Sequence, residues 1–328
     1  MIIKQTTSEK IIEYINKHGK ATGKELSDYI PTITSRAIRK QLKNLLEKNI
    51  LENIGKPPKV YYLIANNKNI PNPVSINKSV MTLINDRYLY ISPTGEMKEG
   101  LEGFIMWCEK TNQDIKNASI KYLETIKKYD KFKKNSLIDG MSKMNSTFDT
   151  VFLDKLFYLD FYSIERFGKT KLGQMLLYSK QSQNKVLIKK LIEEIRPKIL
   201  KIIKDYNIDG VLFIPPTVKR EIQFMKELEK FLKLPTKKMS VTKIKTEIII
   251  PQKTLSILKD RIENAKRTIM VDDFELYTNI LIIDDAVGSG ATLNETAKQI
   301  KDKHVVKGYI IGLAITGSFK GFDIISEV

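Results

Sequence analysis

The chain has 328 residues, of which 56 are Lys or Arg and 38 are Asp or Glu, so its formal net charge is +18. An apolar content of 42% excludes a chain disordered throughout, and a single cysteine excludes an internal disulfide or a cysteine-rich zinc site. Length predicts about two domains. The positive charge favours an anionic partner, although codon bias toward Lys, Ile and Asn can also produce it. We find no membrane-length apolar run and no signal-peptide core, and expect a cytoplasmic protein without membrane contacts.

The first 65 residues predict three helices followed by a β-hairpin. Ser8 can cap the first helix, and the spacing of Thr22 and Glu25 matches a capping box for the second. Apolar residues at helical spacing predict the third helix, and a basic Gly/Pro turn separates two strand-like runs. The expected elements span residues 9–17, 22–29, 35–48, 50–54 and 60–64.

Basic residues of the third helix recur at helical spacing and share one face: Arg36, Arg39, Lys40 and Lys43. Three helices followed by a basic hairpin resemble the winged helix-turn-helix family. The resemblance implies that the third helix enters the major groove of double-stranded DNA, where its basic face contacts phosphates or base edges. It also implies that Lys56 and Lys59, at the hairpin tip, contact phosphates. The alternatives are a solvated basic surface or a winged helix that binds protein.

Residues 66–150 predict a linker followed by a mainly helical connector. Residues 66–78 are rich in Asn and Pro, which is typical of a linker. We expect a strand over residues 88–91 and helices over residues 101–110 and 115–129. The connector shows no catalytic constellation. A homodimer formed through it is an alternative that its sequence does not specify.

The most informative stretch is residues 280–293, which read Ile-Leu-Ile-Ile-Asp-Asp-Ala-Val-Gly-Ser-Gly-Ala-Thr-Leu. The apolar run predicts a buried parallel strand. Two carboxylates follow at its carboxyl end, where open α/β sheets bind ligands, and a small-residue loop leads into a helix over residues 294–303. Such a loop makes an anion site, because free N–H groups and the helix dipole both favour negative charge.

Other nucleotide motifs do not fit this stretch. The Gly-Lys-Ser/Thr of a Walker loop and the third glycine of a dinucleotide fingerprint are both missing. Adjacent carboxylates cannot bind a phosphate, but they can bind ribose hydroxyls or Mg²⁺. A phosphate cradle beside a diol-binding acid pair describes a ribose 5-phosphate site. The alternative is a coincidental acidic turn.

The stretch resembles the phosphoribosyl-pyrophosphate (PRPP) motif of type I phosphoribosyltransferases. The resemblance implies that Asp284 and Asp285 are the catalytic acid pair, which contacts the ribose hydroxyls, and that PRPP binds with Mg²⁺. It also implies a 5-phosphate loop formed by Ala286, Val287, Gly288, Ser289, Gly290, Ala291 and Thr292. The sequence departs from the family at Ala286, where a larger apolar residue is usual, and at Gly288. Some members carry at the latter position an Asp that acts as a base on the purine, which a glycine cannot do.

A basic turn before the motif supplies further candidates. A strand over residues 209–214 ends in a Pro turn, followed by Lys219 and Arg220 and by a helix predicted over residues 221–232. In the family the corresponding loop binds pyrophosphate, and arginine matches phosphate geometry while lysine supplies a point charge. The alternative is a solvated helix start.

The spacing within residues 252–265 is similar to the competence-protein-F-like (ComF-like) branch of the family. That resemblance covers about residues 150–328 and implies that this segment belongs to a mobile loop over the active site. Lys253, Arg261 and Arg267 would then close on pyrophosphate and exclude water. The alternative for each is a charged surface helix.

We therefore expect an α/β protein with three parts: a winged-helix domain (residues 1–65), a linker and mainly helical connector (66–150), and a type I phosphoribosyltransferase fold with a central, mostly parallel sheet flanked by helices (151–328). The favoured hypothesis is a PRPP-responsive transcriptional regulator, because the purine-operon repressor of some bacteria pairs the same domain types. The alternatives are an active phosphoribosyltransferase with a nitrogen acceptor, and a bacterial defence effector. The acceptor, the DNA sequence and the direction of regulation cannot be read from the chain.

Overall fold

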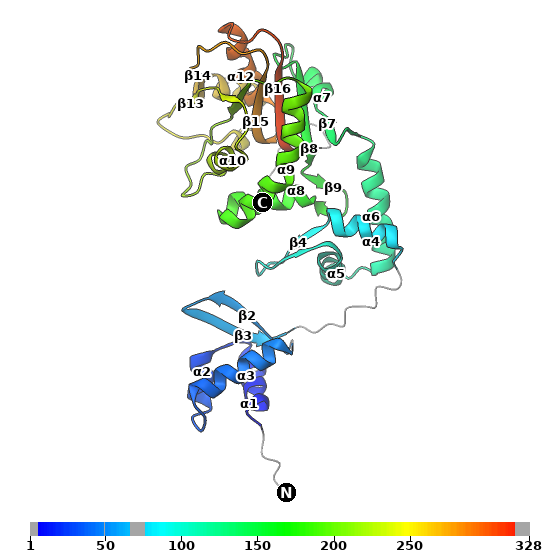
Figure 1. Ribbon diagram of the computed structural model, residues 1–328, viewed down its shortest axis with the longest axis vertical. Coiled ribbons are helices and arrows are strands. Elements are labelled where there is room, and N and C mark those ends of the chain that lie inside the picture. Colours follow the sequence, from blue (N-terminus) through cyan, green and yellow to red (C-terminus); the bar gives the residue numbers. More distant parts are fainter. Residues whose placement is uncertain (1–5, 49, 66–75, 319–328) are drawn as a thin grey trace. The chain divides into compact units, whose positions relative to one another are not determined.

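A computed structural model of the protein describes residues 6–48, 50–65 and 76–318, apart from the side chain of Lys253 (Figure 1). The chain divides into two compact units, residues 1–74 and 75–328. Most of the linker predicted over residues 66–78 lies outside the described residues.

The smaller unit combines three helices with a three-stranded antiparallel sheet of order β1-β3-β2. Ile11, Leu26, Ile38 and Leu42 are almost completely buried and form the centre of its core. The three helices and the hairpin expected from the sequence are all present. Its elements are α1 (Thr7–His18), β1 (Ala21–Thr22), α2 (Gly23–Tyr29), α3 (Ser35–Glu47), β2 (Leu51–Lys56) and β3 (Lys59–Ile64).

Threonine side chains cap all three helices of the smaller unit. Thr22 and Glu25 form the expected capping box of α2, with the Glu25 carboxylate accepting from the Thr22 backbone N–H at 2.7 Å. The cap predicted at Ser8 is wrong. Thr6 accepts from the Glu9 backbone N–H instead, because Glu9 stands three residues after Thr6 and completes a capping box there.

The larger unit is built on a seven-stranded sheet. Its elements are α4 (Lys78–Arg87), β4 (Leu89–Ile91), β5 (Met97–Glu99), α5 (Gly100–Lys110), α6 (Ile115–Asp130), β6 (Lys133–Lys134), β7 (Leu137–Asp139), α7 (Met141–Thr147), β8 (Lys155–Phe161), β9 (Ser163–Ile164), β10 (Gly168–Lys169), α8 (Lys171–Ser182), α9 (Lys185–Asp205), β11 (Gly210–Phe213), α10 (Phe224–Leu232), β12 (Lys237–Lys238), β13 (Val241–Lys243), a 3₁₀ turn (Gln252–Thr254), α11 (Leu258–Thr268), β14 (Ile269–Val271), β15 (Ile280–Val287), α12 (Ala291–Asp302) and β16 (Ile310–Gly317).

The sheet has the order β12-β11-β15-β16-β8-β7-β6, in which β12 to β8 are parallel and the last two strands are antiparallel. Alternate residues of β15 face opposite sides. Ile280 and Ile282 pack in a core with α12, whereas Leu281 and Ile283 pack with α8, α9 and α10. Helices therefore cover both faces, which confirms the expected α/β class with a mostly parallel sheet.

The connector does not stand apart from this unit. α4, α5 and α6 gather around the aromatic rings of Tyr88, Phe104 and Tyr122, and Tyr88 and Phe104 meet edge to face with centroids 5.0 Å apart. Phe167, between β9 and β10, packs on Tyr122 at 5.0 Å. Because this cluster is continuous with the core beside the sheet, residues 75–150 form one unit with the residues that follow.

Candidate functional site

A cavity of about 260 Å³ lies at the carboxyl ends of β11 and β15. From β11 the chain crosses by α10 to β12, and from β15 it crosses by α12 to β16 on the other side. α10 packs on one face of the sheet and α12 on the opposite face, so the two crossovers diverge between β11 and β15. In open α/β sheets this divergence leaves a crevice where ligands bind.

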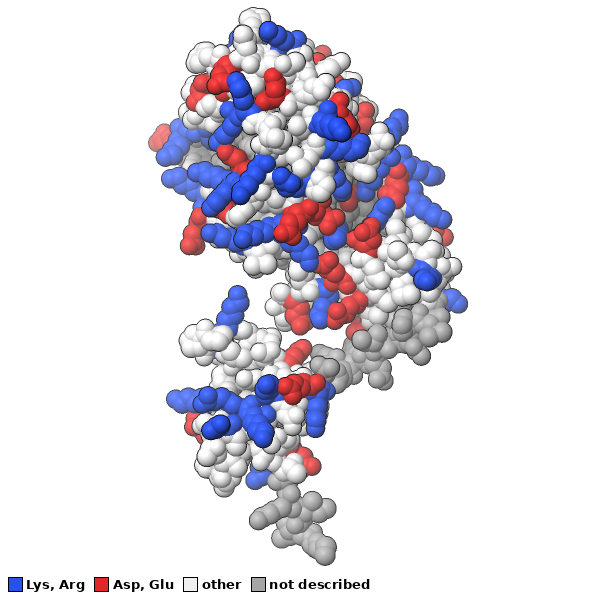
Figure 2. Space-filling model, viewed as in Figure 1, with Lys and Arg blue, Asp and Glu red and all other residues white. Residues whose placement is uncertain are grey.

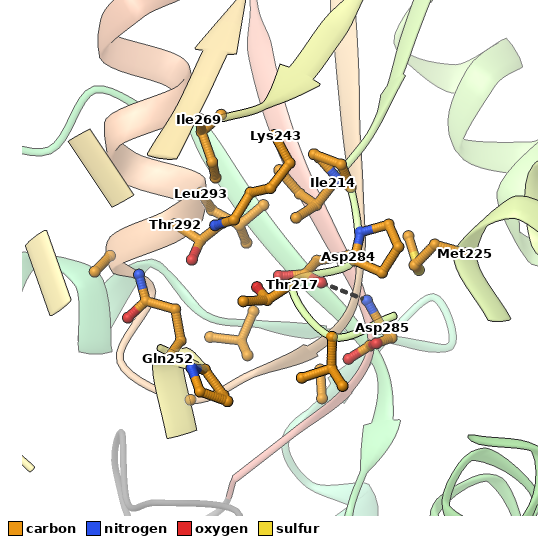
Figure 3. A pocket seen from close by; sticks show the side chains of 18 of the residues that line it. Ile214, Thr217, Met225, Lys243, Gln252, Ile269, Asp284, Asp285, Thr292 and Leu293 are labelled. Atoms are coloured by element: carbon orange, nitrogen blue, oxygen red, sulfur yellow. Dashed lines mark hydrogen bonds between the residues drawn. The ribbon is translucent and has the colours of Figure 1, made fainter. Parts of the chain in front are cut away.

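The predicted acid pair lies at this crevice. Asp284 and Asp285 belong to the last half of β15 and line the cavity, and the strand continues to Val287 rather than ending before the acids (Figure 3). The Asp285 backbone N–H donates to the Asp284 carboxylate at 2.7 Å. All residues of the predicted phosphate loop also line the cavity: Ala286, Val287, Gly288, Ser289, Gly290, Ala291 and Thr292.

The two carboxylates differ in their surroundings. Asp284 is partly buried in the cavity wall, and burial, reinforced by the charge of Asp285, raises its pKa from 3.8 to about 7. Asp285 pairs with the Lys180 ammonium of α8 at 3.1 Å. The structure thus holds one carboxyl that titrates near neutrality beside one that is neutralised by a lysine.

The loop after β15 leads directly into α12, which begins at Ala291, three residues earlier than predicted. Gly290 at its start has a φ of +80°, and a side chain there would collide with the sulfur of Met144. Gly290, the N-cap residue of α12, has no side chain to cap the helix, and the Ser289 hydroxyl accepts only a long hydrogen bond, 3.4 Å, from the Ala291 backbone N–H. The first turn of α12 lines the cavity, and its N–H groups and dipole favour anions there.

Arg261 of α11 lies beside this loop. It is 5% exposed, and its Nε donates to the Leu255 carbonyl at 2.6 Å. Its Nη2 is buried and has no hydrogen-bond partner among the described residues. Burial lowers the pKa of the guanidinium, which is the expected effect of placing a cation in a poorly solvated site.

Lys243 of β13 is a cavity residue that the sequence did not single out. Figure 3 shows it extending into the cavity on the same side as Thr292 and Leu293. Its Nζ donates to the Thr268 hydroxyl at 2.7 Å, and burial lowers the pKa of its ammonium. The available signal was a single charged residue in the short strand that pairs with β14 before the motif.

The other predicted cations are placed less uniformly. Arg220 lines the cavity, but its Nη1 donates to the Lys180 carbonyl, so it ties the turn after β11 to α8. Lys219 is exposed and does not line the cavity. Arg267 is exposed and pairs with Glu263 at 2.7 Å. The side chain of Lys253 lies outside the described residues. The helix predicted over residues 221–232 begins at Phe224.

The basic residues predicted on the third helix are all exposed along α3: Arg36, Arg39, Lys40 and Lys43. Figure 2 shows Lys and Arg side chains gathered over this helix. Lys56 and Lys59 face each other across the last pair of the β2–β3 hairpin, and both are exposed. Lys20 lies over the Tyr61 ring at 4.9 Å on the same small sheet.

Comparisons with known proteins do not assign this chain: neither a family model nor a curated protein matches the sequence. Across the described ranges, no helix is long and apolar enough to cross a membrane.

A metal ion at this site would need oxygen ligands from a bound substrate in addition to those of the protein. In the part of the chain that the structure describes, no group of three or more His, Cys, Asp or Glu side chains is placed to hold a metal. Two adjacent carboxylates suit Mg²⁺ bound through one or two carboxylates and the phosphates of a substrate. Asp284 and Asp285 are the residues that would contact it.

Proposed function

We propose that the protein binds PRPP in the cavity of the larger unit, binds double-stranded DNA through the smaller unit, and acts as a PRPP-responsive transcriptional regulator. On this proposal the larger unit has the type I phosphoribosyltransferase fold and the smaller unit is a winged helix.

The main support for PRPP as the ligand is that an acid pair and an anion site line the same cavity. Asp284 and Asp285 can bind the ribose hydroxyls and Mg²⁺, while the uncapped start of α12 faces the same space and can hold the 5-phosphate. Lys243, which is half-buried, and Arg261, which is buried, add positive charge to the cavity wall. A ligand with a diol between anionic ends, such as PRPP, satisfies all of these groups at once.

The support for DNA comes from the smaller unit. Its order of three helices and a hairpin suits major-groove binding by α3, whose basic face is solvent-exposed. The buried stripe of the same helix, Ile38, Leu42 and Leu45, fixes that face outward. The exposed pair Lys56 and Lys59 at the hairpin end suits a phosphate contact.

The regulator is tested by measuring DNA affinity with and without PRPP·Mg²⁺. Genomic fragments are screened by fluorescence anisotropy, and the tightest is titrated in both conditions. We expect PRPP to change the affinity at least about fivefold, since allosteric couplings are typically of this size or larger. Asp284→Asn with Asp285→Asn should remove the change and leave the DNA affinity of the free protein intact. Equal affinity in both conditions would refute the regulator.

An active phosphoribosyltransferase is the second candidate, because Asp284, with a pKa of about 7, can exchange a proton at neutral pH beside the ribose position. Gly288 offers no base at the position where some purine transferases carry one. Release of pyrophosphate from PRPP in the presence of a nucleobase would favour this function over a sensor.

A further inference from the structure

The backbone of Gly288 is not in the left-handed conformation that favours glycine, in contrast to that of Gly290 two residues later. A Cβ at Gly288 would find ordinary van der Waals contact, with one neighbour, the Nη1 atom of Arg261, at 3.5 Å. An alanine would therefore fit, whereas the further atoms of a threonine or aspartate would compete with the guanidinium for space. The open side of Gly288 is thus matched to Arg261.

The guanidinium at this place has unused donors. Its Nε donates to the Leu255 carbonyl, which fixes the plane of the group, while Nη2 is buried and has no hydrogen-bond partner among the residues that the structure describes. A buried cation that leaves a donor unsatisfied is costly, unless a ligand completes its hydrogen bonds. The planar fork of arginine fits the oxygens of a phosphate, which can accept two parallel hydrogen bonds.

The third part of the arrangement is the start of α12. This helix has 12 residues, its N-cap residue is a glycine without a side-chain cap, and its N-terminus follows Gly288 by only three positions. An anion at this N-terminus gains from the helix dipole and can accept from backbone N–H groups of the first turn, where the Ser289 hydroxyl makes only a long hydrogen bond of 3.4 Å to the Ala291 N–H. The guanidinium approaches the same loop from α11, so two independent sources of positive potential meet beside Gly288.

We propose that Arg261 and Gly288 form the phosphate-monoester end of the cavity, with Gly288 giving the guanidinium access to an anion seated at the start of α12. This inference rests on the proposed function and deepens it. It places Arg261 at the 5-phosphate of the sugar, in contrast to the pyrophosphate role expected from the sequence. It makes a terminal phosphate monoester the group that selects the ligand.

The test uses the full chain and three probes: inorganic phosphate, ribose 5-phosphate and PRPP with Mg²⁺. Binding is followed by phosphorus NMR titration and calorimetry for the wild type, Arg261→Gln and Arg261→Lys. Lys266→Gln is the matched control, because Lys266 is an exposed cation on the same helix and does not line the cavity. Gly288→Thr tests whether the Arg261 guanidinium needs the space beside residue 288 to reach the anion, and it leaves the sequence of α11 unchanged.

We expect Arg261→Gln to lower the affinity for ribose 5-phosphate and for inorganic phosphate at least about tenfold, which corresponds to about 1.4 kcal/mol of binding free energy. Arg261→Lys should recover part of the loss, since a lysine keeps the charge and loses the fork. Gly288→Thr should lower the affinity for the same probes, and Lys266→Gln should leave these affinities within about twofold of the wild type. If Arg261→Gln fails to fold, the comparison of Gly288→Thr with Gly288→Ala decides, because an alanine only makes ordinary van der Waals contact with the guanidinium, whereas the further atoms of a threonine compete with it for space.

The outcomes separate this inference from the function on which it rests. Unchanged phosphate affinity in Arg261→Gln and Gly288→Thr, with PRPP still bound, overturns the inference and leaves the proposed function standing. If phosphate and ribose 5-phosphate bind through Arg261 but PRPP does not bind, the inference stands and the proposed function is refuted. A wild type that binds none of the probes overturns both.

Discussion

The basic residues of the two units differ in their exposure to solvent. Those of α3, such as Arg39 and Lys43, are exposed, and the ion pair between Lys43 and Glu47, at 3.8 Å, leaves both side chains mostly exposed. Those of the cavity, Arg261 and Lys243, are largely enclosed, and burial lowers the pKa of both groups.

This difference separates two kinds of anion recognition. Exposed charges interact weakly one by one and depend on salt, so they suit a polyanion that contacts many of them. Enclosed charges interact strongly at short range and are held in place by hydrogen bonds, so they suit a small anion of defined shape. One chain therefore contains a salt-sensitive surface and a shape-selective cavity, and each can be removed without the other.

The largest expected effect comes from the acid pair. Asp284→Asn with Asp285→Asn should weaken PRPP·Mg²⁺ at least about 100-fold, because two carboxylate ligands are lost in a nearly isosteric change. Calorimetry measures the affinity. Circular dichroism should show the fold retained, and the affinity of the free protein for DNA should not change. An unaltered PRPP affinity would contradict the assignment of the site.

The next effect concerns α3. Arg39→Ala with Lys43→Ala should weaken DNA binding and reduce the slope of log affinity against log salt by about two units, since each lost phosphate contact removes about one. Lys10→Ala with Lys17→Ala removes the same charge from α1 and should change the slope far less. PRPP binding should be unaffected. Equal slopes for the two double variants would contradict an α3 interface.

The pH dependence of stability offers a smaller effect. Asp284 has a pKa of about 7 in the folded protein against 3.8 for an ordinary aspartate, so the folded state holds its proton more tightly. The free energy of unfolding should therefore fall as the pH rises from about 4 to about 7, with a slope from this group of up to about 1.4 kcal/mol per pH unit. Urea unfolding of Asp284→Asn should lack this component. A variant with the wild-type slope would show that Asp284 is not the group responsible.

The smallest expected effect is on the titration of Asp284 itself. The Lys180 ammonium lowers the pKa of Asp284, so Lys180→Met should raise it above the wild-type value. Carbon NMR of the carboxyl groups would follow the shift. Lys185→Met, an exposed lysine at the start of α9, should leave the titration unchanged. A downward shift in Lys180→Met would contradict the account of this ion pair.

The sequence predicted what is local and missed what the fold brings together. The β15–loop–α12 unit and the faces of α3 were predictable, because their signals are continuous: an apolar run with two acids, and helical spacing of apolar and basic residues. Lys180 and Lys243 were missed, since both lie far from the motif in sequence and reach it only through the packing of α8 and β13. The connector was set apart because its aromatic residues gave no hint that they share a core with the sheet.

The placement of Arg261 shows the same limit at finer scale. Its position before the motif was visible, and the resemblance directed it to pyrophosphate. Only the packing of α11 against the loop after β15 places its guanidinium beside Gly288. The wrong helix cap predicted at Ser8 has a local cause instead. The capping-box spacing of Thr6 and Glu9 was visible in the sequence and identifies Thr6 as the N-cap.

The most direct test of the central claim is a phosphorus NMR time course of PRPP and Mg²⁺ with the protein, alone and with a panel of nucleobases. The account predicts that the PRPP lines broaden or shift on addition of the wild type, that Asp284→Asn with Asp285→Asn abolishes this change, and that no pyrophosphate appears. Lines that stay unchanged with the wild type would contradict PRPP binding. Pyrophosphate released with one of the bases would contradict a pure sensor and identify the acceptor of a transferase.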